Sequence, residues 1–387
     1  NHDLKREIAH DAAPQDWIFA LVSLQTMEGY QLKYSGIVRM NSGASSRVML
    51  TLAPIDGTSS KIKTSAWWKH DVKALLSSGE DKDGLKLLWL GEWPHNVQLS
   101  LRDLHPLFIE VCRRVRLGNH DRISGAISTA LKGRIDAESG AWSDPWAPRK
   151  YSDGSALTLG TRNFDYSLLR ELIWGTDSNA SIWVTPPLFG AAEKEKTDTM
   201  AIVAEALARG KGGKTRTDGF MSRVIPMPKV VKKEMMGPRA VELSNDQVKV
   251  IKNIDIALRD SLRLLACDGD WDKRKQKLKS NSARAAIDEK LAPARAALDR
   301  EADALFFPTL WDKLVAGSDD GRHAAHMRFV RRLAQAARDE FTRGAPGIPC
   351  ARIMRPRAEV RGRAALNTGL RKIFDEIGEE EFEDARG

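Results

Sequence analysis

The residues whose spacing most resembles a chemical motif lie in a glycine-rich basic segment near the middle of the chain. The run Gly-Gly-Lys-Thr at residues 212–215 has the ending of a phosphate-binding P-loop, in which backbone amides cradle the phosphates. That motif needs a glycine where Ala208 stands, and it needs a strand before the loop, whereas we predict a helix over Thr199–Ala208. The sequence therefore disfavours nucleotide hydrolysis, although an enzyme that uses this loop remains an alternative.

Histidines beside aspartates are a second possible source of chemistry, because such pairs occur in metal-dependent phosphohydrolases. The additional ligands that such a site needs cannot be assigned here. His323 and His326 could share a helix face, but they lack the glutamate of an HExxH arrangement. No GxSxG elbow or activated cysteine is evident either. We therefore predict no catalytic residue, no metal and no cofactor. The pairs are His2–Asp3, His70–Asp71 and His120–Asp121.

The excess of positive charge predicts a polyanionic partner. The formal charge is +9 and the isoelectric point is near 9.4, and each phosphate that a cation neutralises releases counterions. Residues 209–239 contain nine Lys or Arg against only Asp218 and Glu234. Glycines within this stretch would let backbone amides approach a phosphate or a groove closely. It is the first candidate for nucleic-acid contact, and a solvated basic loop is the alternative.

Two basic patches near the end of the chain, and one polar segment near its start, are further candidates. The patches could follow a phosphate backbone, although solvated helix ends carry similar charge. The polar segment, Gln31–Arg47, has a composition suited to minor-groove or backbone contacts, and a tight turn explains it almost as well. The first patch is Lys273, Arg274, Lys275, Lys277 and Lys279; the second is Arg352, Arg355, Arg357, Arg361 and Arg363; the polar segment holds Gln31, Lys33, Tyr34, Ser35, Arg39, Asn41, Ser42, Ser45 and Arg47.

Length and composition indicate a two-domain protein in a reducing setting. A chain of 387 residues with 42% hydrophobic content exceeds one typical domain. Its three cysteines lie far apart, so we predict no disulfide framework and a cytoplasmic location. No apolar run reaches the roughly 18 residues that span a bilayer, so we predict no membrane partner. Because the sequence begins with Asn1 and not with methionine, we expect a further segment upstream.

The first part of the chain has the pattern of mixed α and β structure. Apolar stretches with strand character are short and separated by Gly, Pro and Asp. Helical patterns lie between them, and we expect the first of these helices to be buried. The predicted strands are 48–52, 85–90 and 97–101; the predicted helices are 16–27, 106–115, 166–174 and 199–208.

The last third has the pattern of four amphipathic helices. Ser244 and Gln247 form a possible capping box that opens the first helix, so we place the domain boundary near Leu243. Three more apolar stripes follow, within 287–305, 327–341 and 358–377. Such stripes are buried when helices pack as an antiparallel bundle. We predict an α+β protein, with a mixed α/β domain over 1–243 and a four-helix bundle over 244–387.

Several segments together resemble the CasA family, the large subunit of the type I-E CRISPR surveillance complex. Their order is preserved and they extend over nearly the whole chain. The segments are NHDLKRE, LQTMEGY followed by SGIVRMNSGASSR, LHPLFIEVCRRVRL, DPWAP, GGKTRTDGFMSRVIP, ALRDSLRLLACDGDWDK and FFPTLWDKL.

The resemblance implies a non-catalytic subunit that inspects duplex DNA for a protospacer-adjacent motif and helps to open the duplex for guide pairing. The implied partners are the guide RNA, the target double-stranded DNA, the backbone, small and handle-binding subunits of the complex, and a helicase-nuclease. The same fold is implied: a mixed α/β domain followed by a helical bundle.

The resemblance also assigns regions to roles. The wedge that enters the duplex would be the hairpin Gly213, Lys214, Thr215, Arg216, Thr217, Asp218 and Gly219, and a minor-groove loop would lie at 29–36. Lys132 and Arg134 lie near the place of a lysine that probes the minor groove in relatives, and Asn1, Lys5 and Arg6 resemble the part that touches the guide handle or neighbouring subunits.

Two departures separate this chain from relatives. A glutamine that wedges the duplex in some of them is not visible in the hairpin, where Asp218 is the candidate for its position. The cysteine-rich insert of some members is absent, which agrees with the lack of metal ligands. An enzyme that uses the GGKT loop or a His–Asp pair, and an RNA-binding scaffold that never inspects DNA, remain the alternatives.

Overall fold

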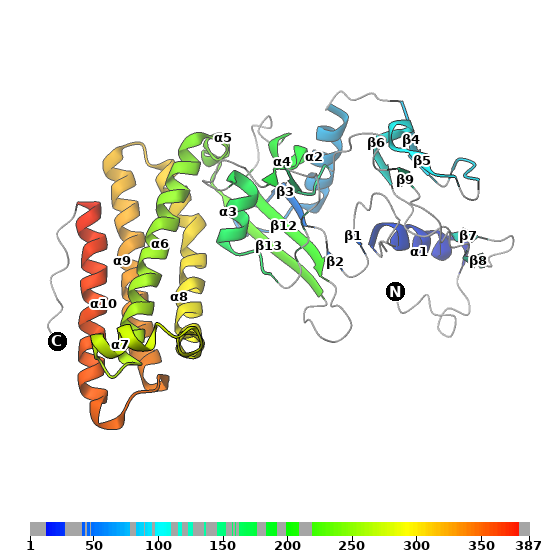
Figure 1. Ribbon diagram of the computed structural model, residues 1–387. Helices are drawn as coiled ribbons and strands as arrows, with labels where there is room; N and C mark the ends of the chain where they lie inside the picture. Colours follow the sequence, from blue (N-terminus) through cyan, green and yellow to red (C-terminus); the bar gives the residue numbers. More distant parts are fainter. Residues whose placement is uncertain are drawn as a thin grey trace. The chain divides into compact units, whose positions relative to one another are not determined.

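The computed structural model divides the chain into two compact units, which are described one at a time (Figure 1). The first unit comprises residues 1–164 and 168–229, and the second comprises 165–167 and 230–387. The structure describes residues 13–27, 41–42, 45–46, 48–77, 83–88, 90–94, 97–109, 115–117, 123–126, 135–136, 145–151, 157, 159, 162–175, 183–191, 199–208 and 219–378.

A three-stranded antiparallel sheet forms the centre of the first unit. Strand β12 (Met200–Ala208) lies between β13 (Gly219–Met227) and β3 (Met49–Pro54). The predicted helix over Thr199–Ala208 is therefore wrong. Five successive side chains of β12, from Met200 to Ala204, are buried, so apolar residues occupy both faces of the strand. An unbroken apolar run of this kind contains helical spacing by coincidence, and its period cannot distinguish helix from strand.

Two helices pack against β3 from within the first unit. They are α2 (Thr64–Ser77) and α4 (Pro187–Ala191). The Nε1 of Trp146 donates to the Oδ2 of Asp71 on α2 at 3.2 Å, and the amide of Leu50 on β3 donates to the Trp146 carbonyl at 2.9 Å. These two bonds connect β3 to α2 through Trp146. Asp71 of the pair His70–Asp71 therefore contributes to the packing of α2 against the sheet.

The remaining strands of the first unit are short. Leu104 and Phe108 lie in strand β6 (Leu104–Ile109), where they are buried with Leu88 and Leu101. A helix was expected to begin at Pro106, and that prediction is wrong because this segment pairs with a strand. The short pairs are β1 (Asn41–Ser42) with β2 (Ser45–Ser46), β4 (Leu85–Leu87) with β6, β5 (Leu99–Ser100) with β9 (Ile135–Asp136), β7 (Val115–Leu117) with β8 (Ile123–Ala126), and β10 (Arg149–Lys150) with β11 (Trp183–Val184).

Two helices predicted in the first part of the chain are confirmed, α1 (Pro14–Met27) and α3 (Tyr166–Trp174). We expected α1 to be buried, but in the isolated chain it is not. Ile18 and Phe19 are 57% and 75% exposed. An apolar helix predicted from composition is not buried where the described part of the chain leaves these side chains uncovered.

The second unit is the predicted four-helix bundle. Its core is formed by aliphatic and aromatic side chains such as Leu258, Leu298, Phe306, Leu333 and Leu366. The α+β class and its C-terminal bundle are confirmed. Among the described residues, no helix has the length and apolar character needed to cross a membrane. The helices are α6 (Pro238–Leu265), α8 (Asn281–Val315), α9 (Asp319–Gly344) and α10 (Arg355–Ile377), with the shorter α5 (Val231–Glu234) and α7 (Trp271–Lys277).

The first long helix of the bundle begins earlier than predicted. Gly237 is its N-cap and Pro238 is its first residue, where a missing amide proton costs nothing. Ser244 is buried inside the helix and donates to the Val241 carbonyl at 2.7 Å, and Gln247 donates to the Phe306 carbonyl of α8 at 3.0 Å. The capping box was therefore wrong, and position 243 lies within α6.

Candidate nucleic-acid interface

The predicted basic hairpin lies at the end of a regular antiparallel stem. Strands β12 and β13 pair without interruption from Met200↔Met227 to Ala208↔Gly219. Residues 209–218 therefore leave one strand and return to the next at directly opposite positions, as in a hairpin. Gly219 begins β13, while Gly213, Lys214, Thr215, Arg216, Thr217 and Asp218 lie outside the described residues.

The stem also corrects the comparison with a P-loop. A strand does precede the GGKT run, so the predicted helix gave a wrong reason for rejecting the motif. A strand, β13, also follows the loop, whereas a P-loop leads into a helix whose N-terminal amides bind phosphate. Ala208 still stands in place of the first glycine. The motif is rejected for the missing helix and the missing glycine.

One feature of the stem was not identified from the sequence. Phe220, the second residue of β13, is 64% exposed beside the basic loop. On the same strand, Arg223 donates to the Phe164 carbonyl at 2.5 Å, and Ser222 donates to Glu205 of β12 at 3.3 Å. Burial raises the pKa of that glutamate. An exposed aromatic on an anchored strand, next to cations, was signalled only by the position of Phe220 after Gly219.

The two basic patches, far apart in sequence, meet in the bundle. Gly269, between α6 and α7, has a φ of +68°, and a Cβ there would lie 2.8 Å from the Cα of Ala358 on α10. The carbonyl of Gly269 accepts from Arg361 of α10 at 3.0 Å. Only glycine allows this close approach in a left-handed conformation. The backbone contact therefore brings α7 and the start of α10 together.

Asp268 holds this junction from a second side. Its carboxylate accepts from the amide of Ala351 at 2.8 Å, from the thiol of Cys350 at 3.3 Å, and from Lys273 of α7. These hydrogen bonds, Lys273's first among them, lower the pKa of Asp268 to about 2. The residue has a φ of 59°, a region that Asp tolerates better than most residues. One side chain thus fixes α6, α7 and the segment before α10.

The structure separates cations that are used internally from cations that are available. Arg355 donates to the carbonyls of Ala345 and Ile348 at 3.0 and 2.8 Å, so it holds a turn in place. Lys273 and Arg274 pair with aspartates. Helix α7 carries most of the first patch, and helix α10 carries most of the second. Six exposed cations of the two patches form neither an ion pair nor a side-chain hydrogen bond within the described residues, and they are here named the unpaired cations: Lys275, Lys277, Lys279, Arg352, Arg357 and Arg363.

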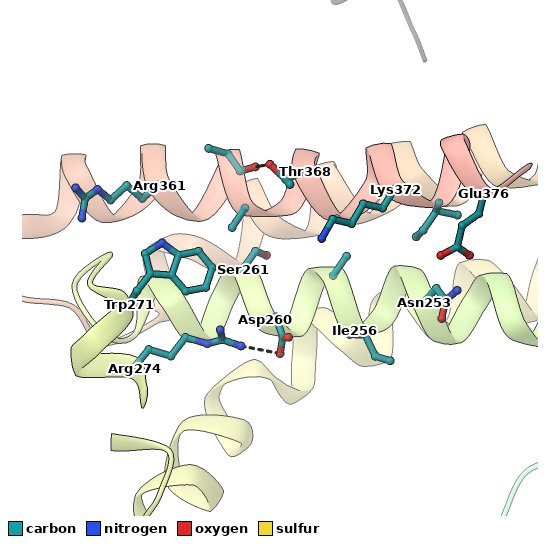
Figure 2. Close-up of a pocket in the computed structure, with 15 residues that line it drawn as sticks. Asn253, Ile256, Asp260, Ser261, Trp271, Arg274, Arg361, Thr368, Lys372 and Glu376 are labelled. Carbon is teal, nitrogen blue, oxygen red and sulfur yellow. Dashed lines mark hydrogen bonds and ion pairs between the residues drawn. The ribbon is translucent and has the colours of Figure 1, made fainter. Parts of the chain in front are cut away.

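A groove of about 740 Å³ lies between α6 and α10, with α7 at one end (Figure 2). Trp271 and Arg274 of α7 and Arg361 of α10 line that end, and Lys372 and Glu376 line the other. Two of the unpaired cations, Lys275 and Lys277, belong to the helix α7 at that end. The groove was not predicted from the sequence, because its lining residues are spread from 253 to 376.

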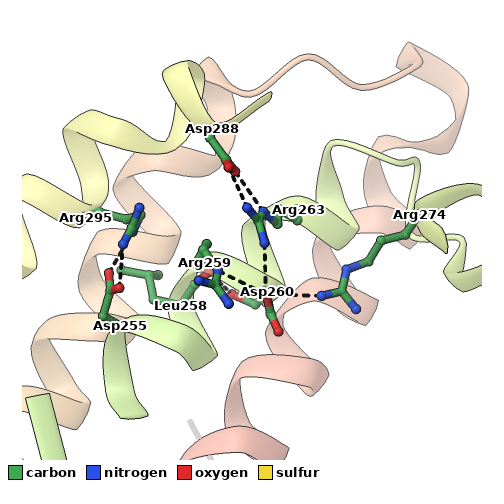
Figure 3. A network of polar contacts seen from close by, with 9 residues as sticks. Asp255, Leu258, Arg259, Asp260, Arg263, Arg274, Asp288 and Arg295 are labelled. Atoms are coloured by element: carbon green, nitrogen blue, oxygen red, sulfur yellow. Dashed lines mark hydrogen bonds and ion pairs between the residues drawn. The ribbon is translucent and has the colours of Figure 1, made fainter. Parts of the chain in front are cut away.

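Arginines and aspartates alternate along the outer face of the α6–α8 contact (Figure 3). Arg263 donates to Asp288 of α8 at 2.8 Å, and Arg295 of α8 donates to Asp255 of α6 at 2.8 Å. The Arg263 contact lowers the pKa of Asp288, and the Asp255 contact raises the pKa of Arg295. Such bidentate pairs fix the two helices in register. Much of the positive charge of the bundle is therefore neutralised internally.

Most other predicted contact residues lie outside the described residues. Asn41 and Ser42 form strand β1, opposite Ser46 and Ser45 of β2, which is compatible with the tight-turn interpretation. No group of three or more His, Cys, Asp or Glu that could hold a metal ion occurs in the described part of the chain. The residues outside it are Asn1, Lys5, Arg6, Gln31, Lys33, Tyr34, Ser35, Arg39, Arg47, Lys132 and Arg134.

Comparison with solved structures identifies the fold. CasA from Thermus thermophilus matches 92% of this chain over 71% of its own, with a TM-score of 0.51 and 13% identity. The CRISPR-associated protein Cse1 from Acidimicrobium ferrooxidans matches 88% of this chain over 66% of its own, with a TM-score of 0.52 and 15% identity. A chain of a CRISPR RNA-guided surveillance complex matches 95% over 70%, with a TM-score of 0.50 and 13% identity.

These likenesses confirm the resemblance to CasA at the level of the fold. No family model matches the sequence, and no curated protein matches it. The chain spans about two thirds of the length of the Acidimicrobium protein. The chain has the CasA/Cse1 fold, over both its mixed α/β part and its bundle.

Proposed function

We propose that this chain, which has the CasA/Cse1 fold, is a non-catalytic subunit of an RNA-guided CRISPR surveillance complex that inspects duplex DNA. Its hairpin would recognise the protospacer-adjacent motif and help to open the duplex, after which the guide RNA reads the target by base pairing. Other subunits of the complex and a helicase-nuclease would be its protein partners.

The observation that carries the proposal is the β12–β13 hairpin. Its stem is anchored in a buried sheet, and its end carries Arg209, Lys211, Lys214 and Arg216 against the single acid Asp218. A rigid stem positions a short loop without ordering a long segment on binding, and cations at its end suit phosphate contact. Short polar side chains among them, such as Thr217, suit hydrogen bonds to base edges.

The bundle would contribute a second, sequence-independent contact. The unpaired cations are exposed and form no ion pair with carboxylates of the described chain. Cations on helices can follow a phosphate backbone, so this surface would hold a single strand of the opened target or the guide. The residues at 1–6, by resemblance, would contact the guide handle or neighbouring subunits.

The test is duplex binding by the reconstituted complex, with and without this chain, over a library of motif sequences that flank one matched target. The proposal expects selective binding only when the chain is present. The double change Lys214→Ala, Arg216→Ala should weaken binding on every motif, because it removes phosphate contacts. Asp218→Ala should change which motif is preferred. Selectivity that survives without the chain would refute DNA inspection.

A charge-matched control removes two cations from the first unit outside the hairpin. Lys61→Ala, Lys69→Ala changes the net charge equally at two exposed lysines and should leave motif selectivity intact. Loss of affinity that is the same for both double variants would show that total charge matters and that the hairpin does not.

The alternatives predict different ligand responses. A nucleotide-dependent enzyme that uses the GGKT loop should melt at a higher temperature with ATP and Mg²⁺, because ligand binding stabilises the folded state by mass action. An RNA-binding scaffold should bind guide RNA with unchanged affinity in the hairpin variants and should show no motif preference. A surveillance subunit should respond to nucleic acid and partner subunits only.

A further inference from the structure

The groove between α6 and α10 has the size and lining of a site for one small planar group. Its volume of about 740 Å³ lies within the range of about 300–1,000 Å³ typical of small-molecule sites. The lining between the helices is made of small residues, among them Ala257, Ala364 and Gly369. A Cβ at Gly369 would lie 2.8 Å from the Cβ of Ala257, so the helices approach closely and leave a narrow slot beside them.

An indole lies at one end of this slot. Trp271 is the first residue of α7 and is 48% exposed. The guanidinium carbon of Arg274 lies 5.3 Å from the centre of the indole ring. Figure 2 shows the indole between the side chains of Arg274 and Arg361. The carboxylate of Asp270 caps α7 by accepting from the amide of Lys273 at 3.0 Å, which holds the tryptophan at the groove.

The charges at this end favour an anionic group. Arg361 is fixed by its hydrogen bond to the Gly269 carbonyl. Arg274 pairs with Asp260 through Nη2 at 3.1 Å, while its Nε is buried and has no hydrogen-bond partner in the described chain. Asp260 is shared with Arg259 and Arg263, so it neutralises no single arginine completely. Three arginines therefore share this one carboxylate.

We propose that this groove binds one unpaired nucleotide of a single strand, with its base against Trp271 and its phosphate against Arg361 and Arg274. Aromatic stacking beside cations is the usual mode of binding single strands without sequence preference. A base within a duplex is stacked on both faces and cannot enter a slot between two helices. The unpaired cations of α7 and α10 would hold the flanking phosphates.

This inference rests on the proposed contact between the bundle and a single strand, and it adds the position and the mode of binding. The test measures fluorescence anisotropy of labelled oligothymidine and oligouridine strands of about twelve nucleotides, and of a DNA duplex, with the full chain. Trp271→Ala should weaken single-strand binding about tenfold and change duplex binding less than about twofold. Trp271→Phe should retain most of the affinity. The ratio between the two strands identifies the preferred sugar.

A second variant distinguishes loss of the site from misfolding of α7 in Trp271→Ala. Ala364→Phe fills the groove from an exposed position on α10 and leaves α7 unchanged, and it should weaken single-strand binding as much as Trp271→Ala does. Trp68→Ala removes an exposed tryptophan, 67% exposed on α2, and is the matched control that should have no effect. A 2-aminopurine base in the strand should be quenched by the native chain and not by Trp271→Ala.

The outcomes separate the two proposals. If single strands bind and neither Trp271→Ala nor Ala364→Phe weakens them, the groove is not a nucleotide site, while motif inspection is unaffected. If no single strand binds the native chain, both the groove and the single-strand role of the bundle are refuted. If the variants behave as expected but motif selectivity does not depend on the hairpin, the nucleotide site in the groove is supported and the proposed DNA inspection is refuted.

Discussion

The hairpin and the bundle both carry positive charge, but they hold it in different ways. The hairpin concentrates four cations within residues 209–216, at the end of a stem whose strand β12 is buried. In the bundle many cations already contact acids or carbonyls, as Arg263 does with Asp288 and Arg355 with Ile348. The number of cations in a sequence therefore does not measure the charge that a ligand can meet. Removing cations of the hairpin should therefore mainly weaken nucleic-acid binding, whereas removing most cations of the bundle should mainly lower the stability of the fold.

The strongest test of this difference removes all four hairpin cations, by Arg209→Ala, Lys211→Ala, Lys214→Ala and Arg216→Ala. Duplex affinity should fall about a hundredfold, and the slope of log affinity against log salt should decrease by about 3.6, because each of the four lost phosphate contacts removes about 0.9. Binding titrations at several salt concentrations measure both quantities. The melting temperature should not change, since the paired strands β12 and β13 are left unaltered. A large loss of thermal stability would show that the hairpin cations also stabilise the fold, contrary to the difference from the bundle described above.

The next largest effect concerns a contact between a buried lysine of α8 and a half-buried histidine of α9. Lys313 contacts the Nδ1 of His326 at 2.7 Å, and burial followed by this lysine lowers the pKa of His326 to about 4. The folded protein therefore holds a neutral histidine where the unfolded chain, with a pKa near 6.5, takes up a proton. The resulting stability is complete above about pH 6.5 and is lost as the pH falls towards 4.

We expect this histidine to contribute about 2 kcal/mol to the pH dependence, after a discount for its partial exposure. Urea unfolding of the native chain and of His326→Leu between pH 4 and pH 7.5 measures it: the variant should show the shallower dependence. The exposed His323 provides the control, His323→Leu. Equal slopes in all three proteins would contradict the prediction.

A smaller effect is expected at the junction that Asp268 holds. Asp268→Ala leaves the amide of Ala351 without its acceptor and removes the partner of Lys273, at a cost of about 1–2 kcal/mol of unfolding free energy. Asp268→Asn keeps an acceptor and a residue suited to positive φ, so it should cost less. Because the pKa of Asp268 is lowered to about 2, its stabilisation is present above about pH 3.8 and is lost as the pH falls through 2. Urea unfolding at pH 7 and at pH 2.5 tests both statements.

The smallest effect comes from two neighbouring arginines of α10. Arg355→Ala removes hydrogen bonds to two carbonyls and should cost about 1 kcal/mol of stability with little change in single-strand affinity. Arg357→Ala removes an unpaired cation, so it should weaken single-strand binding with little change in stability. The slope of log affinity against log salt for single strands should decrease by about 0.7. Thermal melts and anisotropy on the same two samples decide the matter. Identical behaviour would show that the two kinds of cation do not differ.

Local patterns in the sequence predicted the parts of the molecule that local interactions determine. The four long helices were found because stripes such as Ile254, Leu258 and Leu262 face one core. The basic loop was found because cations and glycines are adjacent in the chain. Strand β12 was missed because its side chains are apolar and buried on both faces, which removes the alternation that identifies a strand.

The features that depend on long-range packing were not predictable in this way. The groove joins Asn253 to Glu376, and the contact of Gly269 with Ala358 joins the two basic patches. The sequence Asp268-Gly269 is a turn signal, but it does not say what the turn packs against. Which arginines are neutralised likewise depends on partners in other helices. The sequence predicts which residues are charged, and the packing decides which of them remain available.

The register of the hairpin stem limits how much DNA its end can contact. Residues 209–218 start and finish at the opposite positions Ala208 and Gly219, so half of their contour length, at about 3.3–3.6 Å per residue, gives a reach of at most about 18 Å. The major groove is about 12 Å wide and 8.5 Å deep, whereas a full helical turn is about 34 Å long. The loop is long enough to cross one groove and reach its floor, and too short to follow a turn. If the loop reads DNA as proposed, its contacts would therefore be confined to a few adjacent base pairs.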